Sequence, residues 1–413
     1  MITSPALLRQ RNFLLLWGGQ GISIFGSMLS AIARPFLILR IGGGVSGVSI
    51  VLALTSLPFV FLALPAGAWI DRWDRKWTMI ISDIARGLAI GSLMIALMIG
   101  HISLALIYAS ALVEGIGTVF FSLAETASLP QVVSKEQLSL ATNYNQALFS
   151  IAFLAGPPLG GALFALNPIL PFSSDALSFL ISIISLRLIT VPFQQPHTPT
   201  QARMFHEIGE GILWLWHDPL SRYLTVMNSL INVALGGSVL IFIRLVARAL
   251  PHVSAQALPA FTGTLLTFAG IGGILGAVLC ARLLQYFTLP RLISGSLWVQ
   301  GGILTLLIVA PGYIGLAVLF VASYFLWPSF NAATRGYRLA RIPDQLQGRV
   351  NSVYRLCGYV ADPAGALLIG LLLSHAGIVV TALTRGLFIL GIALLTTITF
   401  SHQKFLREPE KPI

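Results

Sequence analysis

The sequence predicts an all-α polytopic membrane protein with about twelve transmembrane helices. Of its 413 residues, 56% are hydrophobic and only 9% are charged, whereas soluble domains carry about 25% charged residues. The apolar residues fall in repeated blocks of roughly 20 or more, each long enough to cross about 30 Å of hydrocarbon as a helix. The short alternating segments typical of a membrane β-barrel do not occur in the sequence.

The expected spans form two groups of six, with boundaries given to within about 2–4 residues. The first group covers 13–39, 48–70, 77–99, 102–125, 140–166 and 169–190. The second group covers 220–246, 257–284, 289–309, 313–333, 350–374 and 378–400. We therefore expect a six-helix bundle over 1–191, a cytoplasmic linker over 192–218, a second six-helix bundle over 219–401 and a cytoplasmic tail over 402–413.

Lysine and arginine gather in the loops on one side of the predicted spans. That side carries about 18 of them, and the opposite loops carry about three (Arg40, Arg244 and Arg248), so the positive-inside rule places both termini in the cytoplasm. The net charge of +11 comes largely from these cations beside helix ends. We therefore expect a multi-pass protein of the plasma or inner membrane, with no nucleic-acid partner.

The linker combines a proline-rich stretch with a short amphipathic segment. Phe205, Ile208, Ile212 and Trp216 share one face of a helix beginning near residue 204, so this segment is expected to lie at the cytoplasmic membrane surface. A regulatory segment is the alternative interpretation.

The two halves of the chain resemble each other. The stretch 135–138 (Lys-Glu-Gln-Leu) matches 343–346 (Pro-Asp-Gln-Leu) at a constant offset, and Gly67-Ala68 is echoed by Gly276-Ala277. Such a parallel repeat predicts two six-helix pseudo-repeats with a substrate site between them near the membrane midplane.

The densest run of charge lies between spans two and three, at 67–76. Its charges cannot lie in hydrocarbon, so the run is expected to form a tight turn at the cytoplasmic face. A carboxylate at Asp71 can cap the positive N-terminus of a facing helix. The nearby cations are expected to pair with acids on neighbouring spans, and the alternative is that they only anchor the loop inside. The residues assigned to this cytoplasmic gate are Gly67, Asp71, Arg72, Arg75, Lys76, Asp83, Arg86 and Glu125, with Asp83 and Glu125 as the candidate acids.

The same run resembles motif A of the major facilitator superfamily, from which it departs at Asp74, where the family usually has glycine. Three further stretches are similar to the branch of drug and siderophore exporters that includes macrolide efflux proteins. They are Asn12-Phe-x-Leu-Leu-Trp17-x-x-Gln20, Gly156-Pro157-Pro158-x-Gly160-Gly161 and Gly348-Arg349-Val350-Asn351. The resemblance implies the major facilitator fold, ion-driven alternating access and export, with span eleven, starting near Gly348, as the partner of Asp71.

The run Gly156-Pro157-Pro158-x-Gly160-Gly161 lies in the predicted fifth span. Its small residues permit another helix to approach closely. The resemblance implies the motif associated with antiporters, at a contact between spans of opposite halves, and ordinary close packing around a proline kink is the alternative.

Ionisable residues inside the spans are the candidates for proton coupling or substrate binding, because each costs about 3 kcal/mol or more at mid-bilayer unless it is paired or hydrated. Glu114 lies about 18 Å into span four, near the midplane, and Asp362 lies similarly deep in span eleven. Arg34, near the outer end of span one, is expected to extend outward, and Arg385 in span twelve is a further candidate. Asp175 is expected to cap the start of span six.

Several kinds of chemistry are not supported by the sequence. It contains no P-loop, no Gly-x-Ser-x-Gly and no His-Glu-x-x-His, and its two cysteines, Cys280 and Cys357, lie in apolar segments. We therefore expect no enzymatic activity, no cofactor and no metal site.

The sequence thus predicts a secondary active transporter, functioning as a monomer among membrane lipids. We expect it to export amphiphilic or hydrophobic small molecules, drug-, macrolide- or siderophore-like, in exchange for protons, with Glu114 or Asp362 as the coupling carboxylate. Two alternatives stay open: proton-coupled uptake or lysolipid transport by the same fold, and a membrane sensor that transports nothing.

Overall fold

The computed structural model describes residues 4–70, 72–193, 204–343 and 346–402, and these residues are almost entirely helical. The first six long helices are α1 (Arg11–Arg40), α2 (Gly44–Ile70), α3 (Arg75–Met98), α4 (Leu104–Val132), α5 (Leu138–Leu166) and α6 (Ile169–Leu188). The others are α7 (Met204–His217), α8 (Pro219–Leu235), α9 (Ser238–Ala249), α10 (Leu258–Tyr286), α11 (Leu289–Leu306), α12 (Gly312–Phe325), α13 (Trp327–Arg341) and α14 (Gln347–His402).

The described helices account for the predicted number of membrane spans. Ten candidate spans are long and apolar enough to cross a bilayer, and α8 with α9, bent by 41°, makes an eleventh. Helix α14 has 56 residues, about 84 Å at 1.5 Å per residue, and its path turns at Gly377, where φ is 73° and ψ is 179°. A helix of that length holds two spans of about 30 Å each, so the predicted twelve-span helical fold is confirmed.

Two expected spans differ from the structure. The span expected at 220–246 is broken between α8 and α9, where Gly237 has a φ of 65°, in the left-handed region that favours glycine. The span expected at 313–333 is divided into α12 and α13, and Pro328 lies in the first turn of α13, where proline starts a helix without losing a hydrogen bond. Helix α13 then continues to Arg341, into the region expected to be a loop.

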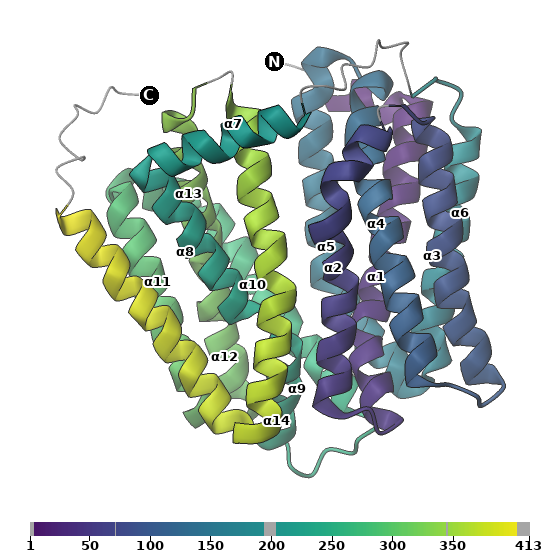
Figure 1. Ribbon diagram of the computed structural model, residues 1–413. Coiled ribbons are helices and arrows are strands. Elements are labelled where there is room, and N and C mark those ends of the chain that lie inside the picture. Colours follow the sequence, from purple (N-terminus) through teal and green to yellow (C-terminus); the bar gives the residue numbers. More distant parts are fainter. Residues whose placement is uncertain (1–3, 71, 194–203, 344–345, 403–413) are drawn as a thin grey trace.

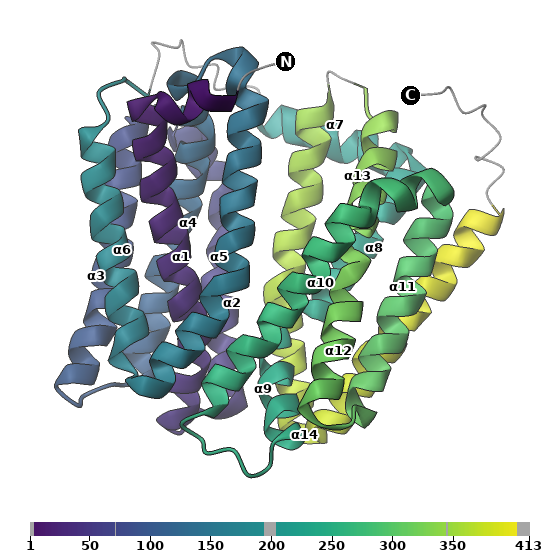
Figure 2. The same cartoon turned by 180° about the vertical axis from the view of Figure 1, so that it is seen from behind.

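The helices form two bundles side by side, α1–α6 in the first half and α8–α14 in the second (Figure 1). Helix α7 lies across one end of the second half, and both the start of α1 and the end of α14 lie at this same end, which we call the α7 end. Between the halves, α5 packs against α10 and α2 packs against α14. The view from behind shows the bundles closest together at the far end and separating toward the α7 end (Figure 2).

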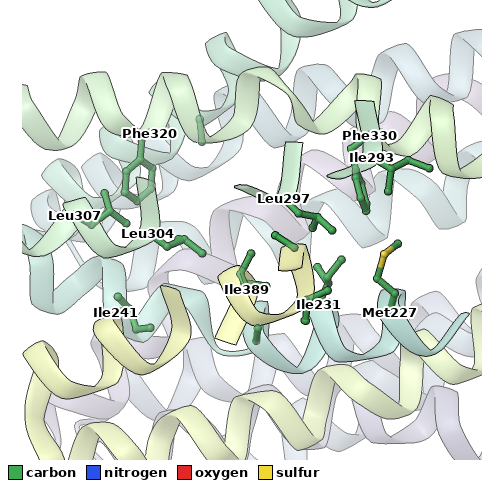
Figure 3. Packing of buried hydrophobic residues seen from close by; sticks show 14 of the residues in the cluster. Met227, Ile231, Ile241, Ile293, Leu297, Leu304, Leu307, Phe320, Phe330 and Ile389 are labelled. Atoms are coloured by element: carbon green, nitrogen blue, oxygen red, sulfur yellow. The ribbon is translucent and has the colours of Figure 1, made fainter. Parts of the chain in front are cut away.

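Each half has an apolar core of its own. In the second half, Ile293 and Leu297 of α11 face Ile231 of α8 and Ile389 of α14 (Figure 3). Internal packing of this kind keeps the helices of one half together.

A further apolar cluster joins the two halves at the far end. Ile243 of α9 and Leu373 of α14 pack in one buried cluster with Phe36 of α1 and Val48 of α2. Because this cluster excludes water, it closes the path between the halves at that end.

Helix α7 is attached to the start of α14. Arg349 forms an ion pair with Glu210, and Leu215 packs in a buried cluster with Ile342 and Val350. On the other side of α7, Trp216 is exposed. The side chains of residues 204–208, half of the predicted amphipathic face, lie outside the described residues.

Candidate functional site

A cavity of about 330 Å³ lies between the two halves. It adjoins a second cavity of about 440 Å³ that shares Thr55, Ser56 and Asp362 as lining residues, and we call the two together the central cavity. Its walls come from α1, α2 and α4 on one side and from α8, α9 and α14 on the other. Three of the four predicted coupling residues, Arg34, Glu114 and Asp362, line it.

Arg34 and Glu114 form a buried ion pair within the first half. Nη2 of Arg34 in α1 donates to Oε2 of Glu114 in α4, and the two side chains are only 5% and 11% exposed. The expectation that Arg34 extends outward is therefore wrong. The buried carboxylate of Glu114 holds Arg34 inside the bundle. The free-energy cost of burying two opposite charges in a low-dielectric interior is far lower when they are paired than when they are separate.

Asp362 has its hydrogen-bond partner on the opposite half. Oγ of Ser56 in α2 donates to Oδ2 of Asp362 in α14 at 2.9 Å. One turn along the same interface, the rings of Phe59 and Tyr359 lie 4.8 Å apart. Among the described residues no lysine or arginine forms an ion pair with Asp362, and Arg355 lines the same cavity two turns earlier in α14.

Asp175 is not a helix cap. Helix α6 begins six residues earlier, at Ile169, and Asp175 is fully buried against α1. It accepts hydrogen bonds from Ser27 at 3.3 Å and from Ser30. Ser27 and Ser30 are three residues apart, so they lie on the same face of α1. This spacing is the signal in the sequence that could have predicted a buried acid facing α1.

Asp83 and Arg86 form a second buried ion pair, on successive turns of α3. Ser182 of α6 donates to Asp83 at 2.6 Å. The guanidinium of Arg86 lies between the rings of Phe121 and Phe179, 4.5 and 4.7 Å from their centroids, so two cation–π contacts add to the pair. Asp83 and Arg86 thus link α3, α4 and α6 inside the first half.

The cations of the 67–76 turn bind backbone carbonyls. Nη1 of Arg75 donates to Ala127 of α4 at 2.8 Å, and Nζ of Lys76 donates to Ile189, at the end of α6, at 2.7 Å. A cation is favoured at the C-terminus of α6, where carbonyl groups lack partners within the helix. Arg72 is exposed.

The predicted pairing of these cations with Asp83 or Glu125 is therefore wrong for the described residues. Asp83 pairs with Arg86, and Glu125 accepts a hydrogen bond from Asn145 at 3.2 Å. Arg75 and Lys76 donate to carbonyl groups near the ends of α4 and α6. Asp83 and Glu125 have other partners.

Asp74, the departure from the family pattern, has a structural role. Its side chain accepts a hydrogen bond from the backbone N–H of Trp77 at 2.9 Å and so caps the N-terminus of α3. An aspartate three residues before Trp77 was a cap signal readable in the sequence.

Gly67 faces open space, since a Cβ added there would have no atom within 4 Å. Asp71 lies outside the described residues, so its proposed contact with α14 stays a prediction.

The motif 156–161 brings α5 against helices of both halves. Gly156 and Gly160 face α1, while a Cβ added at Gly161 would lie 2.2 Å from the carbonyl oxygen of Pro259 in α10. The contact is reciprocal, because a Cβ added at Gly263 of α10 would lie equally close to the carbonyl oxygen of Pro157. Only glycine permits this approach between the halves. The prolines lie inside α5, which continues through them.

Arg385 lies apart from the central cavity, in a cavity of about 170 Å³ inside the second half. Its Nη2 donates to Oγ of Ser238 at 2.6 Å, and Ser238 also lines the central cavity. Among the described residues no group of three or more His, Cys, Asp or Glu side chains is arranged to hold a metal ion.

Two helical bundles that meet at one end and enclose a charged cavity have the architecture of a membrane transporter, and comparison with solved structures agrees. A bacterial homologue of the human lysosomal transporter Spinster, inward-facing and unoccupied, matches with a TM-score of 0.77 at 13% identity, covering 97% of this chain and 98% of that one. Likeness at that identity shows the fold alone, and together with the family match over residues 2–411 it identifies the fold of the major facilitator superfamily.

The chain belongs to the MFS_3 family, described as transmembrane secretion effectors, whose model matches residues 2–411. It is 26% identical over 341 residues to the multidrug efflux pump Tap of Mycolicibacterium fortuitum, covering 80% of this chain and 81% of the relative. It is 25% identical over 398 residues to macrolide efflux protein A of Streptococcus pyogenes, covering 93% and 95%. The chain is a membrane transporter and not an enzyme.

Proposed function

We propose that the protein exports amphiphilic or hydrophobic small molecules in exchange for protons, by alternating access of the central cavity. The observation that carries this proposal is the composition of that cavity. It joins an apolar wall to an ion pair, Arg34 with Glu114, and to a protonatable carboxylate, Asp362. Relatives named as multidrug and macrolide efflux proteins support the direction and the substrate class.

The α7 end is proposed to face the cytoplasm. Lys76, Arg72 and most other cations of the connecting segments lie at this end, as the positive-inside rule requires. The halves separate toward it and are sealed at the far end by the cluster around Phe36 and Leu373. The conformation is then inward-facing, ready to take up substrate from the cytoplasm or the inner leaflet.

Asp362 is proposed as the proton-coupling group, with Glu114 assigned to the substrate site. Its partner, Ser56, belongs to the other half, so movement of the halves changes its surroundings and the free energy of its protonation. Glu114 keeps Arg34 at its side in either state, because both residues belong to the first half. A proton can shift a conformational equilibrium only if it binds the two states with different affinity, and Asp362 meets this condition.

The 67–76 turn is proposed as part of the cytoplasmic gate. Gly67 faces open space when the halves are apart, so its small size matters only when another helix approaches the end of α2. In the outward-facing state the start of α14 is the candidate for that approach. The bulk of the turn is already held in the first half by Arg75 and Lys76.

Transport in proteoliposomes tests the proposal. With ethidium as the probe and an imposed pH difference, native protein should accumulate the dye against its gradient, and a protonophore should abolish this. Asp362→Asn should lose accumulation while retaining dye exchange without a gradient. Glu114→Gln should weaken dye binding while keeping the dependence on pH difference.

Two outcomes contradict the proposal. If Asp362→Asn and Glu114→Gln both accumulate dye normally, neither carboxylate couples protons. If dye moves with the proton gradient instead of against it, the protein is an uptake transporter of the same fold.

A further inference from the structure

The cavity around Arg385, here the Arg385 cavity, lies wholly inside the second half. It occupies about 170 Å³. Its walls are mainly aromatic and aliphatic, with a few polar groups among them. Lining residues used below are Gln300, Phe320, Ser323, Tyr324 and Trp327.

The guanidinium of Arg385 is buried without a carboxylate. The residue is 6% exposed, and its Nη2 donates to the hydroxyl of Ser238. Among the described residues its Nε and Nη1 have no hydrogen-bond partner. A buried, uncompensated charge is strongly unfavourable in a protein interior, and more so at membrane depth.

No described acid is in position to neutralise Arg385. Within 219–402 the sequence contains only Asp344, which lies outside the described residues near the start of α14, and Asp362. Asp362 lines the central cavity and is bonded to Ser56. The buried arginines of the first half differ, because Arg34 and Arg86 each have a carboxylate partner.

We propose that the Arg385 cavity binds a compact organic carboxylate. A guanidinium presents parallel N–H groups that match the two oxygens of a carboxylate. Ser323 donates to Oε1 of Gln300 at 3.2 Å, which leaves the amide N–H₂ of Gln300 as a further donor beside the cavity. Phe320, Tyr324 and Trp327 supply an aromatic wall for the apolar body of the ligand.

The volume sets the size of the ligand. A protein cavity of about 150 Å³ holds benzene, so a space of about 170 Å³ takes one ring with a carboxylate and excludes anything as large as a macrolide. Leu235 and Ser238 line both this cavity and the central cavity, and they mark the route by which a ligand passes between them. The proposal does not depend on export, because it concerns binding alone.

Titration calorimetry of the purified full-length protein tests the site, with benzoate as the probe and benzamide as its neutral isostere. We expect benzoate to bind native protein at least tenfold more tightly than benzamide. Arg385→Gln should reduce the benzoate affinity at least tenfold, to the level of benzamide, while leaving benzamide unchanged. Arg385→Lys, which keeps the charge but not the paired donors, should fall between.

Control variants separate the site from charge in general and from misfolding. Arg248→Gln removes an exposed cation from the same half and should leave benzoate binding unchanged. Ser323→Leu should abolish binding by filling the cavity while Arg385 remains, which keeps the proposal testable should Arg385→Gln fail to elute as a folded protein.

Three results would overturn the proposal. In the first, benzoate and benzamide bind native protein equally. In the second, Arg355→Gln, which removes a cation from the central cavity, lowers benzoate affinity as much as Arg385→Gln does. In the third, chloride displaces benzoate at equal concentration, which would show a site for a bare inorganic anion.

Discussion

The buried arginines Arg34 and Arg86 of the first half are each paired with a carboxylate of that half, whereas Arg385 of the second half is not. In the first half Arg34 pairs with Glu114, and Arg86 pairs with Asp83. In the second half Arg385 is bonded to a hydroxyl, and the carboxylate of Asp362 is bonded to a serine of the other half.

This difference assigns different roles to two bundles of similar architecture. A paired buried charge fixes the helices that carry it, because separating the pair leaves an uncompensated ion in the interior. We propose that the first half acts as a frame that presents a fixed ion pair to the cavity. The second half carries Arg385 and Asp362, which are bonded to neutral hydroxyl groups, and we propose that these are the groups that a proton, a ligand or a movement of the halves affects.

Removing one partner of the central ion pair should have the largest effect. Arg34→Gln leaves Glu114 buried without a counter-charge, and we expect a loss of about 3–5 kcal/mol in stability. The double variant Arg34→Gln/Glu114→Gln should recover most of it, because no charge remains. Thermal unfolding followed by fluorescence-detected size exclusion measures both. Equal melting temperatures for the single and double variants would show that the pair does not hold the first half together.

Enlarging Gly161 should disturb the contact between the halves. A methyl group there meets the carbonyl oxygen of Pro259, so Gly161→Ala should disfavour this conformation by about 1–3 kcal/mol. Gly273→Ala on α10 is the matched control, since a Cβ there has no atom within 4 Å. Cysteine accessibility at the far end should rise for Gly161→Ala alone. An increase of the same size in both variants would show that the close approach is not what closes that end.

Removing the cap of α3 should have a smaller effect that stays inside the first half. Asp74→Ala loses the bond to the N–H of Trp77 and should cost about 1 kcal/mol, whereas Asp74→Asn keeps an acceptor and should cost much less. The thermal unfolding assay separates the two variants. If the alanine variant is as stable as the asparagine variant, the cap is dispensable.

Gly67→Ala should leave stability within about 0.5 kcal/mol, because open space surrounds the residue in this conformation. If the end of α2 is approached by another helix in the outward-facing state, the same variant should slow transport. Comparing melting temperature with dye accumulation therefore separates a gate from a loop anchor. Normal transport by Gly67→Ala would favour the anchor.

The sequence predicts the class of fold well and the contacts of the site poorly. Span number and the two-half layout follow from hydropathy and repeats, which report composition along the chain. Glu114 and Asp362 could be chosen as candidates from their depth in the predicted spans alone, because an acid within a long apolar segment is conspicuous.

What the sequence does not reveal is the rotation of each helix about its axis. That rotation decides whether Arg34 extends outward or turns toward Glu114. A single sequence of nearly uniform hydrophobicity carries little information on it. The wrong prediction for Asp175 concerns the start of α6, which lies six residues earlier, at Ile169. The cap at Asp74 is different, since its signal was local and present in the sequence.

A pH-dependent distance between the halves tests the central claim most directly. Spin labels at Thr142 of α5 and Gln285 of α10, both exposed near the α7 end, report how far the halves are separated there. The background for labelling replaces the native cysteines, Cys280 and Cys357, with serine.

The account predicts that a change of pH shifts the populations of long and short distances between the two spin labels. Asp362→Asn should abolish this response, and Glu114→Gln should retain it. A native protein whose distances ignore pH, or an unaltered response in Asp362→Asn, would contradict the claim that a carboxylate shared between the halves couples protons to their movement.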